Sequence, residues 1–168
     1  IKINVISGNG SALLERLKSE GANSPADIFF TVDAGNLWKI QKEGYFQSIS
    51  SAKALSIVPK NLRGPNNEWI AIAKRARVIF YNPDNVSSAA IKDLGYENLA
   101  DKEWSKRIVI RSSNNIYNQS LVASLISTHG VEKTELWAKG LVSNFARKPQ
   151  GNDRSQIMAV ANGMADLA

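Results

Sequence analysis

The stretch Arg111-Ser-Ser-Asn-Asn-Ile-Tyr-Asn-Gln-Ser-Leu-Val-Ala-Ser-Leu125 predicts how the rest of the chain is arranged. An apolar run at 108–110 is typical of a strand, and it leads through a polar turn into the pattern of an amphipathic helix. Tyr117 lies where that helix is expected to begin. Such a turn presents backbone N–H groups and the positive end of a helix dipole. In an open α/β sheet it also lies at the edge where ligands bind. Tyr117 is therefore a candidate binding residue, although a half-buried tyrosine bonded to the backbone fits the same pattern.

Composition excludes several kinds of site. The chain has 168 residues, no cysteine and one histidine, so neither a disulfide, a thiolate metal site nor a histidine metal cluster is expected. It carries 21 Lys and Arg against 15 Asp and Glu, which gives a net charge of +6. These charges are scattered along the sequence, whereas a nucleic-acid-binding protein gathers them on one face. No apolar run has the length that a membrane-spanning helix needs.

The first part of the sequence predicts two strand–helix units. Residues 1–6 alternate apolar and polar, as in a strand with one exposed face. Ser11 is a candidate N-cap for the helix that follows, and Gly21 is expected to end it. Residues 27–32 form a nearly continuous apolar run, which indicates a central parallel strand covered on both faces. Asp33 follows this strand, where it is expected to cap the next helix and could also face a ligand cleft.

Two further strands are predicted at 68–73 and 75–81, and the second meets Asn82-Pro83. We expect residues 79–84 to cross between two lobes, because the residue before a proline favours an extended backbone. Arg75 and Arg77 would share one face of their strand. Two arginines on a strand that faces a cleft would attract an anion. Solvated charges at the edge of a sheet fit the pattern equally well.

The last part of the sequence predicts helices. A helix at 131–142 is expected to bury Leu136, Trp137, Leu141 and Val142. Another is expected to have Asn152 or Asp153 as its N-cap and to end at Gly163, before a last strand that begins at 166. The alternation of strands and helices predicts an α/β fold with parallel sheets covered by helices. We expect two lobes, at 1–80 and 81–168.

Four sequence blocks, in this order, carry a resemblance to a known family. They are Pro25-Ala-Asp-Ile-Phe-Phe-Thr-Val-Asp-Ala-Gly-Asn-Leu37, Arg75-Ala-Arg-Val-Ile-Phe-Tyr-Asn82, Tyr117-Asn-Gln-Ser120 and Gly151-Asn-Asp153. Together they resemble the periplasmic ferric-iron-binding proteins, the substrate-binding subunits of bacterial iron ABC importers, and above all the tyrosine-rich cyanobacterial type. The resemblance covers essentially the whole chain.

The resemblance implies a class II periplasmic-binding-protein fold, in which two α/β lobes are joined by crossover strands. It implies a monomeric, periplasmic protein that binds Fe(III) and delivers it to an inner-membrane ABC permease. Tyr117 matches the tyrosine ligand of the second lobe. The adjacent tyrosine pair of the family would fall beyond Ala168, and another ligand would fall before Ile1. We therefore expect a chain truncated at both ends, which leaves the sheet of its first lobe incomplete and binds iron weakly by itself.

Ligand chemistry agrees with that family. Fe(III) is a hard ion that prefers anionic oxygen ligands, and metals deprotonate their ligands on binding. Arg75 or Arg77 could balance anionic ligands or hold a synergistic anion such as carbonate. Asp33, Ser112 and Asn115 are the other residues that we expect around the metal or its anion.

Two other functions remain open. A carrier of a small organic or inorganic anion would have the same fold and would use Arg75, Arg77 and the turn at 112–115. An enzyme is disfavoured, because the chain has no cysteine, its one histidine has no evident partner, and no spacing marks a carboxylate pair.

Overall fold

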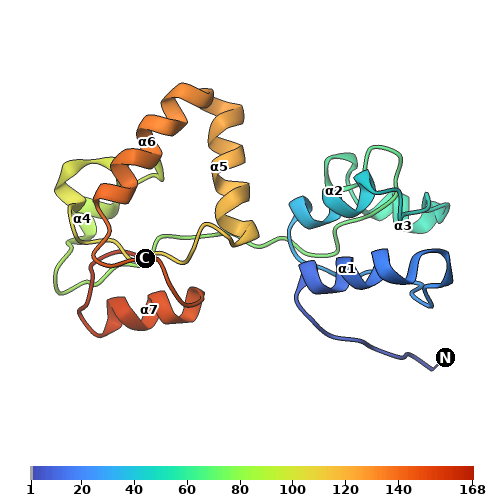
Figure 1. Cartoon of the computed structure of the whole chain (residues 1–168). Coiled ribbons are helices and arrows are strands. Elements are labelled where there is room, and N and C mark those ends of the chain that lie inside the picture. The colour runs from blue at the N-terminus through green and yellow to red at the C-terminus, as the bar shows by residue number, and fades with distance from the viewer. Residues whose placement is uncertain (1) are drawn as a thin grey trace. The chain divides into compact units, whose positions relative to one another are not determined.

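The computed structural model describes residues 2–168. The chain divides into two compact units, with the boundary between Arg75 and Ala76. The helices α1 to α3 belong to the first unit and α4 to α7 to the second (Figure 1). No helix among the described residues is both long and apolar enough to cross a membrane. The lobes predicted at 1–80 and 81–168 stay a prediction for the folded whole protein.

Polar caps define the helices of the first unit. Their bounds are Gly10–Glu20 for α1, Ala34–Lys42 for α2 and Ala52–Ile57 for α3, with single 3-10 turns at Gly21–Asn23 and Lys60–Leu62. Gly21 ends α1 with φ of 52°, as predicted. The N-cap of α1 is Asn9 and not Ser11, because the Asn9 side chain accepts the N–H of Ala12 at 2.8 Å. The segment between α2 and residue 68 contains α3, which the sequence analysis does not predict.

The strands predicted in the first unit are wrong for the described residues. Residues 2–6 and 27–32 have no strand assignment, and Ile1 lies outside the described residues. Ile28 is 84% exposed and Phe30 is 71% exposed, so the segment predicted to be a covered central strand is uncovered. A strand forms only where a neighbour satisfies its backbone groups. The bridge of Arg63 with Ile70 marks the one short antiparallel pairing described in this unit.

The second unit contains longer helices and a buried core. Its helices are α4 at Ser88–Ile91, α5 at Ile116–His129, α6 at Val131–Ser143 and α7 at Asp153–Ala161, with 3-10 turns η3 at Glu97–Ala100 and η4 at Lys102–Trp104. Helices α5 and α6 pack against each other as a hairpin, and α6 packs against η3. The predicted helix starts at Tyr117, 131 and Asn152 are confirmed to within one residue.

Isolated bridges take the place of the sheet predicted in the second unit. Leu167 bridges Tyr81 in the antiparallel sense and Ile108 in the parallel sense, and Ile108 also bridges Phe145. Paired hydrogen bonds of 2.9 Å join Phe80 to Ala168 in both directions. Each pairing is too short to count as a strand, so the regular strands predicted at 75–81 and 108–110 are not seen among the described residues. The unit is a helix-rich structure around a rudimentary pairing of extended segments.

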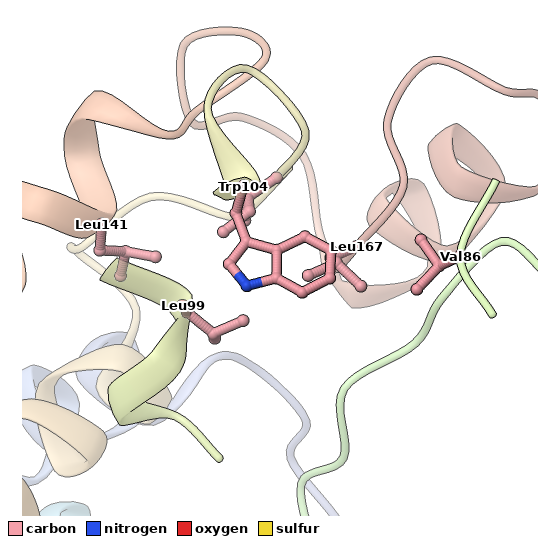
Figure 2. Packing of buried hydrophobic residues seen from close by; sticks show 6 residues of the cluster. Val86, Leu99, Trp104, Leu141 and Leu167 are labelled. Carbon is pink, nitrogen blue, oxygen red and sulfur yellow. The ribbon is translucent and has the colours of Figure 1, made fainter. Parts of the chain in front are cut away.

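Trp104 lies at the centre of the main hydrophobic cluster of this unit. Its indole is buried among side chains from several segments, namely Val86, Leu99, Ile108, Leu141 and Leu167 (Figure 2). Trp104 therefore packs over Ile108, in the segment that follows it. The cluster holds Tyr81, Ile108 and Leu167 together, and so it supports the backbone that leads to the turn at 111–117.

The buried face of α6 includes two of the four residues predicted for it. Trp137 and Leu141 do face the protein, but Leu136 is 69% exposed and Val142 is 61% exposed. The buried stripe runs from Thr134 through Trp137 to Leu141, which is the spacing of one helix face. The prediction failed at Leu136 and Val142 because apolar residues beside a stripe cannot be told from those within it until the packing partner is known.

Candidate functional site

Tyr117 is the second residue of α5, where the sequence predicted it. Its backbone N–H donates to Oδ1 of Asn115 at 3.0 Å, and Asn115 is the N-cap of the helix. This cap fixes the first turn of α5 and with it the direction in which the tyrosine side chain leaves the backbone. The Tyr117 side chain is half-buried. A phenol held at a helix start is well placed for an anionic role, because the helix dipole is positive there.

Two guanidinium groups of the second unit lie beside the Tyr117 ring. The guanidinium carbon of Arg77 is 3.5 Å from the ring centroid, and that of Arg111 is 5.7 Å from it. Both distances are within the range in which a cation is attracted to an aromatic face. The structure thus brings Arg77 to Tyr117, a proximity that the sequence did not specify, and it adds Arg111, which was not among the predicted site residues.

The polar groups of the turn before α5 form hydrogen bonds with one another. Ser112 Oγ accepts the N–H of Asn114 at 3.2 Å, and the Ser112 carbonyl accepts the N–H of Asn115 at 3.1 Å. With the Tyr117 N–H bound to Asn115, these amides already have partners. Ser112 and Asn115 therefore shape the turn, and their contact with a bound anion stays a prediction.

Asp33 and Arg75 belong to the first unit. Asp33 is the N-cap of α2, and its carboxylate accepts the N–H of Gly35 at 2.8 Å, which confirms the capping role expected from the sequence. Its φ of 72° is uncommon for a residue other than glycine and is tolerated best by Asn and Asp. Arg75 is exposed. The proximity of either residue to Tyr117 stays a prediction.

Asp153 is a second functional candidate that the sequence did not reveal. Its carboxylate Oδ1 pairs with Nη1 of Arg111 at 2.8 Å. The backbone carbonyl of Arg111 accepts from Nδ2 of Asn118 at 2.9 Å, and Asn118 follows Tyr117 in α5. Two signals in the sequence pointed to Asp153: it lies in one of the four blocks that carry the family resemblance, and it opens a helix.

Other potential sites lie elsewhere or are missing. Within residues 2–168, no group of three or more His, Cys, Asp or Glu side chains could hold a metal ion. A hollow of about 630 Å³ lies beside α7, where Arg147, Asn152 and Met158 contribute to its wall, and Tyr117 is not part of it. Tyr117 with its two arginines therefore remains the best-defined candidate in the second unit.

Sequence relatives of this chain are named for iron. Iron uptake protein A1 of Synechocystis is 54% identical over 167 residues, which are 99% of this chain and 46% of that relative. A Trichodesmium protein (IdiA, FutA), solved in complex with iron and citrate ligands, has a TM-score of 0.91 and 55% identity, over 99% of this chain and 52% of that one. The ferric binding protein of Campylobacter jejuni has a TM-score of 0.93 at 40% identity, over 100% of this chain and 53% of its own.

The chain spans about half the length of these relatives. The family model described as bacterial extracellular solute-binding protein matches residues 23–162, which is most of the chain and includes Tyr117, Arg111 and Asp153. The chain therefore belongs to the family of bacterial extracellular solute-binding proteins.

Proposed function

We propose that this chain forms the part of a periplasmic ferric-iron-binding protein that contributes the Tyr117 ligand, and that the whole protein delivers Fe(III) to an inner-membrane ABC permease. One observation carries the proposal. The Tyr117 phenol lies at the start of α5 beside the Arg77 guanidinium, at 3.5 Å from ring centroid to guanidinium carbon, in a chain whose iron-named relatives align along its whole length.

The chemistry of this arrangement suits a hard, highly charged cation. Fe(III) prefers anionic oxygen, which a phenolate supplies, and the chain contains no cysteine that could reduce it. Binding of the ion would displace the phenolic proton, as metals do with their ligands generally. The guanidinium groups of Arg77 and Arg111 would balance the charge of anionic ligands, or hold a small anion such as carbonate that completes the coordination of the iron.

The fold that fits this function is the class II periplasmic-binding-protein fold, with two α/β lobes near 1–80 and 81–168 joined by crossover strands. The exposed apolar side chains of Ile28 and Phe30 support it, since they are what a strand shows when its sheet neighbours are absent. The whole protein would then be a periplasmic monomer and a binding module, with no catalytic activity of its own.

A carrier of a small anion is the second candidate. Two guanidinium groups near one ring favour it, because arginine forks recognise carboxylates and phosphates. The internal hydrogen bonds of the turn at 112–115 count against it, because they occupy amides that such a carrier would turn to its ligand.

Titration with ferric citrate separates the two candidates. The test uses the whole protein at the length of its relatives, at fixed bicarbonate, and follows visible absorbance. A ferric-binding protein with phenolate ligands gives a coloured complex, because electrons are transferred from phenolate to iron on absorption. An anion carrier gives no colour with ferric ion and binds citrate equally well without iron, a result that would contradict the ferric proposal.

A further inference from the structure

The charges around Tyr117 pose an electrostatic problem for a site that binds a cation. Arg77 and Arg111 both lie within 5.7 Å of the ring centroid. Like charges this close repel each other, and together they repel a third positive charge. The side chain of Arg111 is 20% exposed, so water screens its charge less than it screens that of an exposed residue such as Arg77. Without a compensating negative charge, Arg111 would therefore repel a bound cation more strongly, for its distance, than an exposed arginine would.

Asp153 supplies the compensating charge at that position. Its Oδ1 lies 2.8 Å from Nη1 of Arg111, which is a short, charge-assisted hydrogen bond. The carboxylate is also held from its own side, because Asp153 is the first residue of α7, where the helix dipole favours a negative charge. Asn152 and Ser155 form a reciprocal capping box that fixes this helix start. The Asp153 side chain is 51% exposed, and its carboxylate is nevertheless held in place by Arg111 and by the capped start of α7.

Arg111 is tied to the candidate ligand through its backbone as well. Its carbonyl accepts from Nδ2 of Asn118, the residue after Tyr117, at 2.9 Å, and the same Nδ2 approaches the Ser112 carbonyl at 3.3 Å. One arginine therefore connects the first turn of α5 to the first turn of α7. The position of its charge relative to Tyr117 is set by both helices.

We propose that Asp153 determines the charge selectivity of the Tyr117 site. By neutralising Arg111, it leaves one net positive charge among Arg77, Arg111 and Asp153, so that the site admits a trivalent cation and not a free anion. This inference rests on the ferric-binding function proposed above. It makes Asp153 a specificity-determining residue that acts through Arg111 and has no contact of its own with the ligand.

A purely structural role makes a different prediction. If the pair merely fastens α7 to the segment at 108–112, then removing either partner, or both, has the same effect on stability and the same indirect effect on binding. If the pair sets the charge of the site, removal of the carboxylate alone is harmful, and removal of both partners restores the balance of charge. The double variant therefore distinguishes the two roles.

The experiment compares wild type, Asp153→Asn, Arg111→Gln and the double variant Asp153→Asn with Arg111→Gln in the whole protein. Retention of Fe(III) is measured by competition with citrate at fixed bicarbonate, at low and high salt, with thermal unfolding measured in parallel. We expect Asp153→Asn to retain iron about 10-fold less well, the scale of a group one step removed from the metal. High salt should reduce this loss, because it screens the uncompensated charge. The double variant should regain most of the retention without regaining stability.

Three results would contradict either the role of Asp153 or the ferric-binding function, and they can be told apart. Equal iron retention by wild type and Asp153→Asn, with a normal visible band in both, overturns the role of Asp153 and leaves the ferric function standing. A double variant as weak as Asp153→Asn shows that the pair acts by fastening α7, which also overturns the inference. A wild-type protein that shows no visible absorbance band when titrated with ferric citrate contradicts the proposed ferric-binding function itself.

Discussion

Single polar side chains decide the local geometry of this protein, and Asp166 shows how. Its carboxylate accepts hydrogen bonds from Nε of Arg107 and, at 2.8 Å, from Nδ2 of Asn85, while the side chain is 14% exposed. Burial alone would raise the pKa of Asp166, but these hydrogen bonds and the charge of Arg107 outweigh it and hold the pKa below its ordinary value. Asp166 thereby links the segments at 82–86, 104–107 and 166–168.

This lowered pKa predicts how stability depends on pH. A carboxylate with a lower pKa in the folded protein stabilises it fully above the unfolded pKa, about 3.9, and loses that effect as the pH falls toward the folded value. We expect Asp166→Asn to lower the free energy of unfolding by about 2 kcal/mol near neutral pH. The difference from wild type should shrink below about pH 4. Urea unfolding followed by tryptophan fluorescence measures it, with the exposed Asp93→Asn as the control; a difference that is constant with pH would contradict the role of the ionised carboxylate.

Arg75 and Tyr117 should differ in their effect on iron. Arg75 is expected to act on the metal through space or through an anion, and water partly screens such an effect. Tyr117 is expected to bind the metal directly. Loss of a group one step from the metal typically costs about 10–100-fold in affinity, so we expect Arg75→Ala to weaken iron retention less than Tyr117→Phe does. Chelator competition at fixed bicarbonate, with and without salt, measures both; a larger loss in Arg75→Ala would favour the anion carrier.

Part of the candidate site can be predicted from the sequence, and part cannot. Tyr117 and its cap Asn115 follow from a local pattern, because a helix start is specified by neighbouring residues. The pairing of Arg111 with Asp153 joins residues that are 42 positions apart, and nothing local specifies it. The contact of Arg77 with Tyr117 likewise depends on the path of the chain between them. Charge compensation across a site is therefore visible only once the fold is known.

Helices and extended segments differ in the same way at the scale of elements. The starts of α2, α5 and α7 and the end of α1 lie close to the predicted positions, because a capping side chain or a glycine specifies each one locally. A strand depends on a neighbour that is distant in the sequence. The segment at 27–32 has the composition of a buried strand, and yet Ile28 and Phe30 are exposed. The composition of this segment thus predicted neighbouring strands on both sides, and no such strand is seen among the described residues.

Gly140 lets α6 approach the 3-10 turn η3 closely. A Cβ at this position would lie 2.9 Å from both Cβ and the carbonyl oxygen of Ala100, which is too close for either contact. Overpacking of this kind lowers the free energy of unfolding by about 1–3 kcal/mol. The higher helix propensity of alanine raises it by about 1 kcal/mol. We therefore expect Gly140→Ala to destabilise the second unit by about 1 kcal/mol in urea unfolding. The exposed neighbour Lys139→Ala should have almost no effect, and a stabilised Gly140→Ala protein would show that η3 can move away freely.

Most of the buried hydrophobic side chains of the chain belong to the second unit. Among the described residues of the first unit, Ile40 is the one buried hydrophobic side chain of the core, whereas the second unit contains the cluster around Trp104 and another around Val109. Stability in a protein follows buried apolar contacts. The first unit also exposes Ile3, Val5, Ile28, Phe30 and Ile72. Exposed apolar segments of this kind favour association with other chains.

Hydrogen exchange should reveal this difference within residues 1–168. We expect amides of the first unit to exchange through local opening, at rates well above those of α5, α6 and α7. Mass spectrometry of peptides from the two units, at a protein concentration low enough to prevent association, makes the measurement. Equal protection of both units would show that the first unit is stabilised by contacts other than a buried core.

The central claim is that Tyr117 binds ferric ion, and the visible absorbance of the iron complex tests it most directly. The measurement compares wild type with Tyr117→Phe in the whole protein, titrated with ferric citrate at fixed bicarbonate. Phenylalanine keeps the packing of the ring and its attraction to Arg77, and it removes one anionic oxygen ligand. We predict that the phenolate-to-iron absorbance falls in part and that citrate removes the iron more readily from Tyr117→Phe. Unchanged colour together with unchanged retention against citrate would contradict the claim, because it would show that the Tyr117 oxygen does not touch the metal.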